Sequence, residues 1–226
     1  MSNNEMSFIQ AVRQRRAVRR FLPQALTQEQ LIEVLEDAQW SPSNCNTQPW
    51  QVHILSGKTK NELSRLLLAD EEQGNQSPDF WFDQQAYTGI YSERVHHMGK
   101  SRYEALGIAR EDKAARRNYS RRNLSFYGAP HVALLFMPHF GDDVRTAGDI
   151  GMYGQTFMLS LTSRGYASVP QTVLGLYAGT IKKFLNIPEE VKMMFGISFG
   201  YADPESPADQ INLGRAHINS YVTFHQ

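Results

Sequence analysis

The sequence has 226 residues, with 23 Lys and Arg against 23 Asp and Glu, a formal net charge of zero, and 41% hydrophobic residues. This composition is typical of a folded globular protein, and the charge balance disfavours a nucleic-acid-binding protein, which usually carries a basic excess. The single cysteine, Cys45, excludes an intrachain disulfide and zinc sites built on paired cysteines.

The first fifty-five residues predict two helices and a strand. Ser7 to Arg16 has the pattern of a short amphipathic helix. Thr27 and Gln30 form a capping-box pattern, which begins a second helix that runs to about Trp40. Gln51 to Leu55 alternates between apolar and polar residues and is rich in β-formers, which predicts a strand.

Thr59 to Ala69 predicts a further helix, and the chain then changes character. Residues 70–127 are polar, charged and aromatic, which indicates a helical segment with loops that leaves the core. The adjacent pair His96 and His97 points in two directions on a helix, which favours a solvated face over a metal site.

The second half predicts the buried centre of the fold. The expected elements are a buried strand over His131–Met137, a long apolar helix over Asp149–Ser163 that Gly165 ends, a short helix over Thr180–Leu185, a buried strand over Val191–Tyr201 and a last short strand over Tyr221–His225. Because strands and helices do not alternate as regular βαβ units, we predict an α+β fold in which helices cover a sheet. No linker divides the chain, so residues 1–226 are expected to form a single domain.

No apolar run of about 18 residues, the length that a membrane-spanning helix needs, is present. Met1 to Arg20 is polar and arginine-rich, unlike a secretory signal. We therefore expect no membrane partner and a cytoplasmic location. The sequence also lacks the G-x-G-x-x-G and G-x-x-x-x-G-K-[ST] patterns of the common nucleotide-binding folds.

Two segments carry the chemistry. Five arginines crowd eight residues: Arg13, Arg15, Arg16, Arg19 and Arg20. Such a cluster suits a phosphate, although a solvated helix end explains it equally well. Ser41 to Trp50 is dense in amides and hydroxyls, so it is either a loop that holds a planar heterocycle or a well-capped connection.

Taken together, the motifs resemble the nitroreductase family. R-R-A-V-R at residues 15–19 and S-P-S-N-C-N-T-Q-P-W at residues 41–50 are similar to its N-terminal signature. N-L-S-F-Y-G-A-P at residues 123–130, D-I-G-M-Y-G-Q at residues 149–155 and S-V-P-Q at residues 168–171 are similar to later motifs of that family, in the same order. The resemblance extends over nearly the whole chain.

The resemblance implies a mixed, mainly antiparallel sheet covered by helices on both faces, in an intertwined homodimer that binds FMN at the subunit interface. Its phosphate and ribityl contacts fall on the segment from Arg15 through Arg16 and Ala17 to Arg19, and on Arg215. The other matching residues are Pro42, Ser43, Asn44 and Asn46 in a loop that the partner lays against the flavin, Asn123 at its pyrimidine end, and Pro170, Gln171 and Thr172 in a turn near its N5 atom. Cys45 is expected to be a small packing residue.

The resemblance further implies that NAD(P)H reduces bound FMN and that a nitroaromatic or quinone-like acceptor reoxidises it by a ping-pong mechanism. No protein side chain is expected to be an indispensable acid or base, and Arg16 is the candidate cation near the flavin N1 atom. The alternatives are a reductive dehalogenase or flavin reductase of the same superfamily, or a non-enzymatic protein that stores or senses FMN.

Residues 70–127 resemble the variable insertion of the subgroup that reduces nitrobenzoates. Its aromatic side chains either shape an acceptor pocket or pack the insertion onto the core: Phe80, Trp81, Phe82, Tyr87, Tyr91 and Tyr103. Its arginines either form a solvated face or select anionic acceptors or the 2′-phosphate of NADPH: Arg94, Arg102, Arg116 and Arg117.

Overall fold

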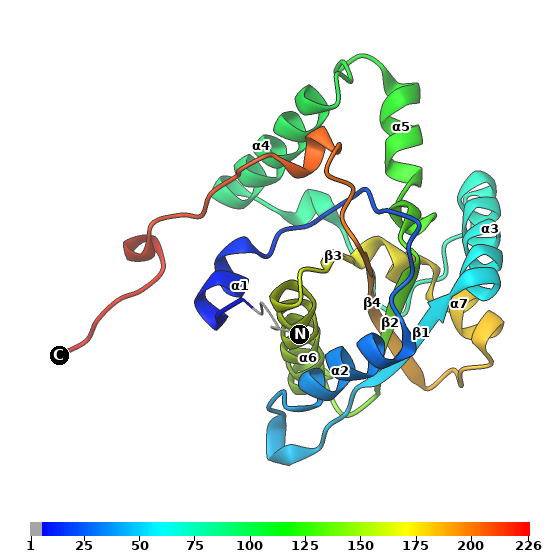
Figure 1. Cartoon of the computed structure of the whole chain (residues 1–226), viewed down its shortest axis with the longest axis vertical. Helices are drawn as coiled ribbons and strands as arrows, with labels where there is room; N and C mark the ends of the chain where they lie inside the picture. Colours follow the sequence, from blue (N-terminus) through cyan, green and yellow to red (C-terminus); the bar gives the residue numbers. More distant parts are fainter. Residues whose placement is uncertain (1–5) are drawn as a thin grey trace.

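The computed structural model describes residues 6–226 of the chain (Figure 1). The helices of this part are α1 (Phe8–Gln14), α2 (Gln28–Gln39), α3 (Gly57–Gln73), α4 (Gly89–Ala105), α5 (Lys113–Arg121), α6 (Val144–Ser163) and α7 (Ala178–Leu185). The strands are β1 (Gln51–Ser56), β2 (His131–Pro138), β3 (Ala167–Gln171) and β4 (Val191–Gly200). They form one sheet in the order β1-β2-β4-β3, in which every strand pair is antiparallel.

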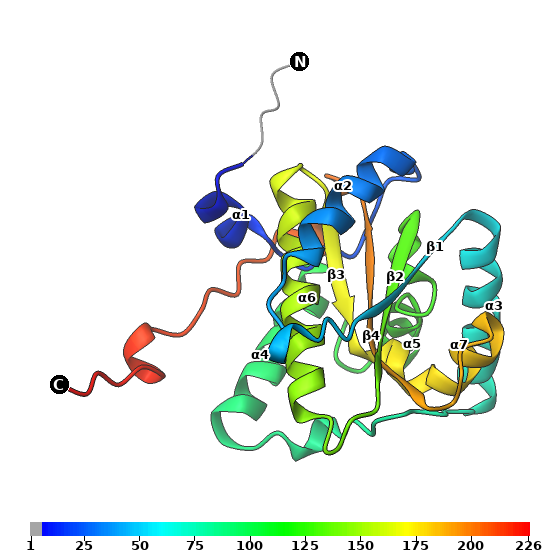
Figure 2. The ribbon, with the colours of Figure 1, turned by 90° about the horizontal axis from the view of Figure 1, so that it is seen from below.

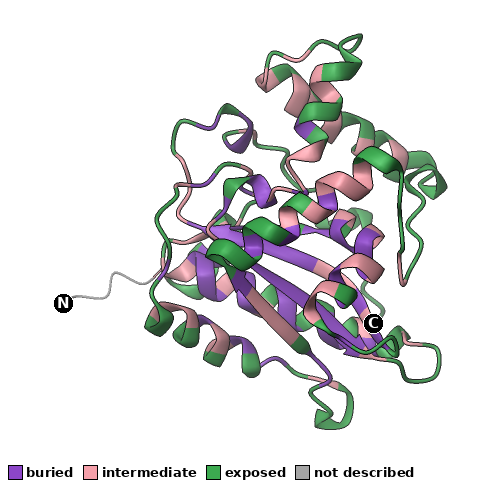
Figure 3. Cartoon of the chain, turned by 90° about the vertical axis from the view of Figure 1, so that its right-hand side faces the viewer, coloured by how far each residue is buried: buried purple, intermediate pink, exposed green. Residues whose placement is uncertain are grey.

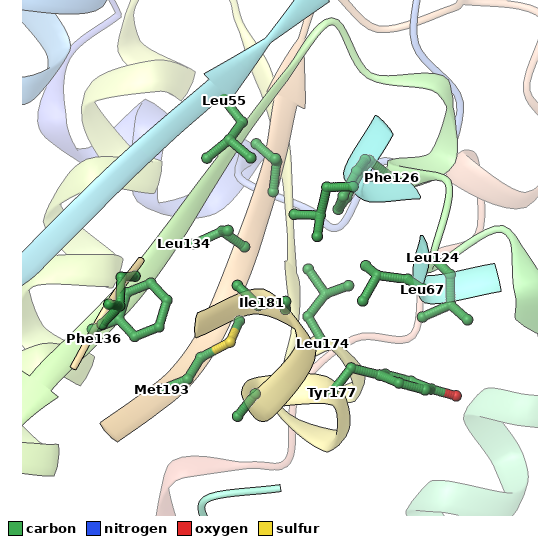
Figure 4. Close-up of a cluster of buried hydrophobic side chains, with 14 of the residues drawn as sticks. Leu55, Leu67, Leu124, Phe126, Leu134, Phe136, Leu174, Tyr177, Ile181 and Met193 are labelled. Atoms are coloured by element: carbon green, nitrogen blue, oxygen red, sulfur yellow. The ribbon is translucent and has the colours of Figure 1, made fainter. Parts of the chain in front are cut away.

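Helices cover both faces of this sheet. Figure 2 shows α2 and α6 on one side of the sheet and α3 and α7 on the other. Alternate residues of β2 supply the two cores: Val132, Leu134 and Phe136 face α3 and α7, and Ala133 and Leu135 face α2 and α6. Figure 4 shows the first of these clusters, and Figure 3 shows the buried strands beneath helices with exposed outer faces. The predicted helix-covered α+β fold is confirmed.

A β-bulge lets β4 serve both cores. The register passes from Leu135 opposite Phe195 to Phe136 opposite Met193, so Met194 has no direct partner on β2. An extra residue reverses which alternate side chains face each side of a sheet. Met193 therefore packs in the α3–α7 core, whereas Ile197 packs in the α2–α6 core.

The predicted helix ends are close to the observed ones where a cap defines them. The Thr27 side chain accepts a hydrogen bond from the Gln30 amide at 3.3 Å, and Gln30 Oε1 accepts one from the Thr27 amide at 2.9 Å, as the capping box predicts. Gly165 follows α6 with φ of 78°, in the left-handed region that a helix-ending glycine favours. Helix α6 begins at Val144 rather than at Asp149, because Gly148 does not interrupt the helix before Ile150.

Two sequence predictions about strands are wrong. Tyr221–His225 belongs to no strand, and these residues are exposed on an arm that leads away from the body of the chain in Figures 1 and 2. Conversely, Ala167–Gln171 is strand β3, so Pro170 and Gln171, which were predicted in a turn with Thr172, belong to a strand. Pro170 fits there because β3 is an edge strand of the sheet, where a missing amide proton removes no ladder bond that the fold requires.

Residues 15–22 continue the sheet without being counted as a strand. Ala17 forms an isolated parallel bridge with Ser168, and the Val18 amide donates to the Ser168 carbonyl at 3.0 Å. This bridge is the parallel component of the sheet that was predicted as mixed. It aligns the arginine-rich segment with β3, running in the same direction.

A buried histidine connects the start of α2 to the sheet. His131 is 2% exposed, and its Nε2 atom accepts a hydrogen bond from the Leu26 amide at 2.9 Å. The acceptor role requires a neutral ring with its proton on Nδ1, which lies beside the Ser56 hydroxyl. Burial, and then the nearby Lys60 ammonium, lower the pKa of His131 from its ordinary value of 6.5.

We expect this histidine to make the fold less stable in acid. Below about pH 6.5, His131 takes up a proton in the unfolded chain but not in the folded one. The stability that the neutral, buried His131 contributes is therefore complete above that pH and is lost as the pH falls below it. The free energy of unfolding should decrease by up to about 1.4 kcal/mol per pH unit. Urea unfolding at pH 7.5 and 5.5 measures the effect. His131→Gln should be less stable at pH 7.5 but should lose less stability than the parent on acidification; an equal loss in both proteins would contradict the assignment.

Candidate functional site

A cavity of about 1020 Å³ lies between the end of α1, the extended segment 15–19, helix α4 and the stretch 208–215. Six arginines line it: Arg13, Arg15, Arg16, Arg19, Arg102 and Arg215. The only lining carboxylate in the described chain is that of Asp209. No described carboxylate forms an ion pair with any of the six arginines. Such an excess of unpaired positive charge is suited to an anionic ligand.

Arg15 and Arg215 form the first cationic pair of this cavity. They are 200 positions apart in the sequence, yet both line the cavity. Burial, and then the neighbouring Arg215 charge, lower the pKa of Arg15. Two guanidinium groups that repel each other without a carboxylate between them define a place for a bound anion.

Arg19 and Arg102 form a second pair. The Arg19 amide donates to Asp209 Oδ1 at 2.9 Å, and its carbonyl accepts from Arg122 at 3.0 Å, which fixes the backbone. Burial, and then the Arg19 charge, lower the pKa of Arg102. The second carboxylate oxygen of Asp209 is buried and has no hydrogen-bond partner among residues 6–226.

The predicted residues at the far end of β3 lie together. The Gln171 side chain donates to the Asn123 carbonyl at 2.8 Å and accepts from the Ser198 hydroxyl. Gln171 is 2% exposed, while Asn123 is half-buried. Thr172 follows directly and begins a turn of 3-10 helix. The structure therefore brings Asn123, Pro170, Gln171 and Thr172 to one end of the strand along which the arginine segment runs.

The loop with Pro42, Ser43, Asn44 and Asn46 lies elsewhere. Its Asn44 amide donates to both oxygens of the buried Asp149 carboxylate, at 3.1 and 3.2 Å. Asp149 and the cavity-lining Thr162 are both on α6, and thirteen residues of α-helix extend over about 20 Å. Within one chain, this loop is therefore held near the start of α6, and the cavity borders the end of the same helix.

The backbone of this loop is unusual. Cys45, Asn46 and Gln48 have φ values of 51°, 55° and 48°, in the left-handed region that side chains other than those of glycine and asparagine avoid. Such conformations persist where the surroundings enforce them, and they concentrate at functional sites. Cys45, expected to be a small packing residue, is exposed in the single chain and is not part of its core.

The arginine cluster divides differently from the sequence prediction. Arg20 pairs with Asp203 at 2.7 Å and does not line the cavity. Arg16 lines the cavity but is exposed, whereas Arg15 and Arg19 are half-buried. For Arg102 the sequence left open a solvated face or a role toward anionic ligands, and its distance along the sequence from the other arginines concealed its place in this cavity.

The six aromatic residues of segment 70–127 that the sequence singled out do not pack it onto the core of the same chain. Five of them are exposed: Phe80, Trp81, Phe82, Tyr87 and Tyr91. Tyr103 instead contacts Tyr119 edge-on and lies beneath the Arg116 guanidinium, 4.3 Å from the ring centroid. Tyr103 therefore packs within the insertion itself, as do Phe82 and Tyr87 edge-on against each other, and none of the six packs the insertion onto the core.

Comparison with known proteins matches this sequence and fold to one family. The pattern of the Nitroreductase family matches residues 12–201. The chain is 39% identical to nitroreductase NfnB of Mycolicibacterium smegmatis over 94% of its own length and 90% of the relative's, and 32% identical to a 4-nitrobenzoate reductase of Pseudomonas putida over 96% and 95%. The crystal structure of the FMN-dependent nitroreductase NfnB from Mycobacterium smegmatis in complex with NADPH superimposes with a TM-score of 0.92 at 38% identity, covering 96% of this chain and 97% of the other.

The sheet covered on both faces and the arginine-lined cavity thus define a protein of α+β architecture built to hold an anionic ligand. The match extends over most of the chain at both the sequence and the structural level. The chain belongs to the nitroreductase family.

Proposed function

We propose that this protein is an FMN-dependent oxidoreductase that uses NAD(P)H to reduce nitroaromatic or quinone-like acceptors in a ping-pong sequence. The observation that carries the proposal is the cavity lined by six arginines without an ion-paired carboxylate. The similar proteins named above are described as FMN-dependent, as bound to NADPH and as acting on 4-nitrobenzoate. When bound, FMN supplies the hydride-accepting and electron-donating chemistry, and the protein binds and orients it.

The residues present fit this cofactor. The FMN phosphate is a dianion, and the Arg15–Arg215 pair offers planar guanidinium donors that match phosphate oxygens. The half-buried Asn123 amide supplies donors and acceptors of the kind that the polar edge of a flavin ring requires, and the buried Gln171 side chain holds Asn123 in place. In this assignment Arg16 and Ala17 line the ribityl path, and Pro170 and Thr172 border the ring beside Gln171.

We further propose a homodimer in which each flavin lies between two chains. Asp149, which holds the loop Pro42–Asn46, and Thr162, which lines the arginine cavity, are about 20 Å apart along α6, so we assign this loop to the flavin site of a partner chain. The exposed apolar residues of the C-terminal arm support this assembly, because such side chains usually find a partner surface: Ile218, Tyr221, Val222 and Phe224. Phe8 and Ile9 on α1 are exposed too, where an amphipathic helix was predicted to bury them.

The single-domain organisation remains part of the proposal, with 70–127 as an insertion that shapes the acceptor side of the site. Its exposed Trp81 and Phe82 are available to a partner chain or an aromatic acceptor. Among the helices of residues 6–226, none combines the length and apolarity that crossing a bilayer demands. A cytoplasmic location is supported by the single cysteine, since disulfides are rare in that compartment.

One experiment tests cofactor and assembly together. We expect the purified protein to sediment at twice the chain mass of 25.8 kDa, with flavin absorbance in the same boundary and about one FMN per chain after denaturation. Anaerobic NAD(P)H should bleach that flavin rapidly, and a nitroaromatic should restore its colour. A protein that neither retains nor takes up FMN would overturn the proposal. Rapid bleaching followed by reoxidation only by free flavin or a halogenated aromatic would favour the flavin reductase or dehalogenase alternative, and absent bleaching would favour storage or sensing.

A further inference from the structure

Helix α4 of the insertion contributes a charge to the cofactor cavity. Arg102 is half-buried and lines the cavity together with Arg19, although the two are 83 positions apart in the sequence. Its guanidinium donates a hydrogen bond to the Met98 sulfur and forms no ion pair with a described carboxylate. A thioether is a weak acceptor, so the positive charge of Arg102 is uncompensated by the rest of the chain as described.

The two cationic pairs occupy different places along the cavity. The segment from Arg15 to Arg19 is extended, and four residues at about 3.3 Å each separate these two positions by about 13 Å. The parallel bridge of Ala17 with Ser168 places Arg19 toward Pro170 and Arg15 toward the other end of β3. The Arg19–Arg102 pair is therefore at the Gln171–Asn123 end, and the Arg15–Arg215 pair is at the opposite end.

A phosphate group is only about 3 Å across, so one phosphate cannot neutralise two pairs that are separated by about 13 Å along the backbone. A flavin mononucleotide carries its phosphate at one end and the carbonyl oxygens of its pyrimidine ring at the other. Those oxygens accept hydrogen bonds, and they carry additional negative charge when the flavin is reduced. The positions of the pairs match the two ends of such a ligand.

We propose that Arg102 is a cofactor-binding residue that acts with Arg19 on the pyrimidine end of the flavin, and that Arg15 and Arg215 hold the phosphate. This inference rests on the proposed function, because it assigns residues to the FMN site. It makes the insertion at 70–127 part of the cofactor site itself. It also transfers the role of the cation near the flavin N1 atom from Arg16, which is exposed, to the Arg19–Arg102 pair.

Riboflavin, which lacks the phosphate, tests the assignment. Titration of apoprotein with FMN and with riboflavin, followed by quenching of flavin fluorescence, gives both affinities. Arg102→Gln should weaken both ligands by about the same factor, roughly tenfold for one charge-assisted hydrogen bond. Arg215→Gln should weaken FMN and leave riboflavin unchanged. The midpoint potential of bound FMN should become more negative in Arg102→Gln, because a cation near the ring favours the reduced form.

Lys100→Gln is the matched control. Lys100 is on the same helix, is 74% exposed and pairs only with Glu104 at 3.8 Å, so its removal takes the same charge from α4 outside the cavity. The inference is overturned if Arg102→Gln binds both ligands as Lys100→Gln does, or if it weakens FMN alone. Failure of the parent protein to bind FMN would instead overturn the proposed function, so the two failures are distinct.

Discussion

Replacing both Arg15 and Arg215 by glutamine is expected to weaken FMN binding by about a thousandfold. Each guanidinium contributes a charge-assisted contact to phosphate of about 2 kcal/mol, and each 1.4 kcal/mol corresponds to a tenfold change in affinity. The two residues lie together in the cavity, where burial and then the Arg215 charge lower the pKa of Arg15, and their mutual repulsion disappears with either substitution. The loss of binding free energy in the double variant should therefore be slightly smaller than the sum for two independent contacts.

Fluorescence titration of the apoprotein at two salt concentrations measures this effect. The parent affinity should fall as salt rises, because ions screen the cavity, and the double variant should show a much flatter dependence. Arg20→Gln is the control, since Arg20 belongs to the same arginine-rich segment but pairs with Asp203 outside the cavity. If the double variant binds FMN as tightly as Arg20→Gln does, the FMN phosphate does not bind at this end of the cavity.

Asp79→Ala is expected to lower the free energy of unfolding by about 3–5 kcal/mol, the usual cost of removing one partner from a buried ion pair. The Asp79 carboxylate accepts from Lys182 at 2.7 Å and from the Met193 amide at 2.8 Å, and Lys192 lies 3.4 Å away. Lys182 is 1% exposed. Although burial opposes its charge, the hydrogen bonds to Asp79 and Glu189 raise the pKa of Lys182.

Urea unfolding of the apoprotein at neutral pH measures the loss, because bound FMN would mask it by mass action. Glu104→Ala breaks the exposed Lys100–Glu104 pair and should cost less than about 1 kcal/mol. The double variant Asp79→Leu with Lys182→Met should recover most of the stability, since apolar side chains leave no unpaired buried charge. Equal losses for Asp79→Ala and Glu104→Ala would show that the buried network contributes nothing beyond a surface pair.

The parts of the fold that sequence predicted correctly are those that local chemistry determines. The capping box fixes the start of α2, the apolar run over His131–Met137 identifies β2, and Gly165 ends α6. Strand β3 escaped detection because it is short and contains Pro170, and its identity depends on β4 and residue 17 beside it. Tyr221–His225 failed for the opposite reason: its alternation suits a strand, but no strand within residues 6–226 pairs with it.

In the candidate site, too, the residues that local motifs identify were predicted, and those that depend on contacts between distant segments were not. Local motifs located the arginines and the loop 41–50, and the resemblance ordered them around one ligand. Only the three-dimensional structure separates Arg20 from the cluster and adds Arg102, because salt-bridge geometry and the path of α4 depend on contacts between distant segments. The exposure of Cys45 was likewise hidden, because it depends on where the loop 41–50 lies in the folded chain and not on residue type.

Helix α6 has a consequence for the geometry of the proposed dimer. It holds the Asn44 loop near its first residues through Asp149, and it borders the arginine cavity near its last residues through Thr162. In a two-fold assembly each copy of α6 would therefore extend from one flavin to the other, and its length would set the distance between the two cofactor sites. Inserting one helical turn between Asp149 and Thr162 would lengthen α6 by about 5.4 Å and would move the Asn44 loop of each chain away from the cofactor of its neighbour. Both cofactors would then loosen at once, although neither set of arginines had been touched.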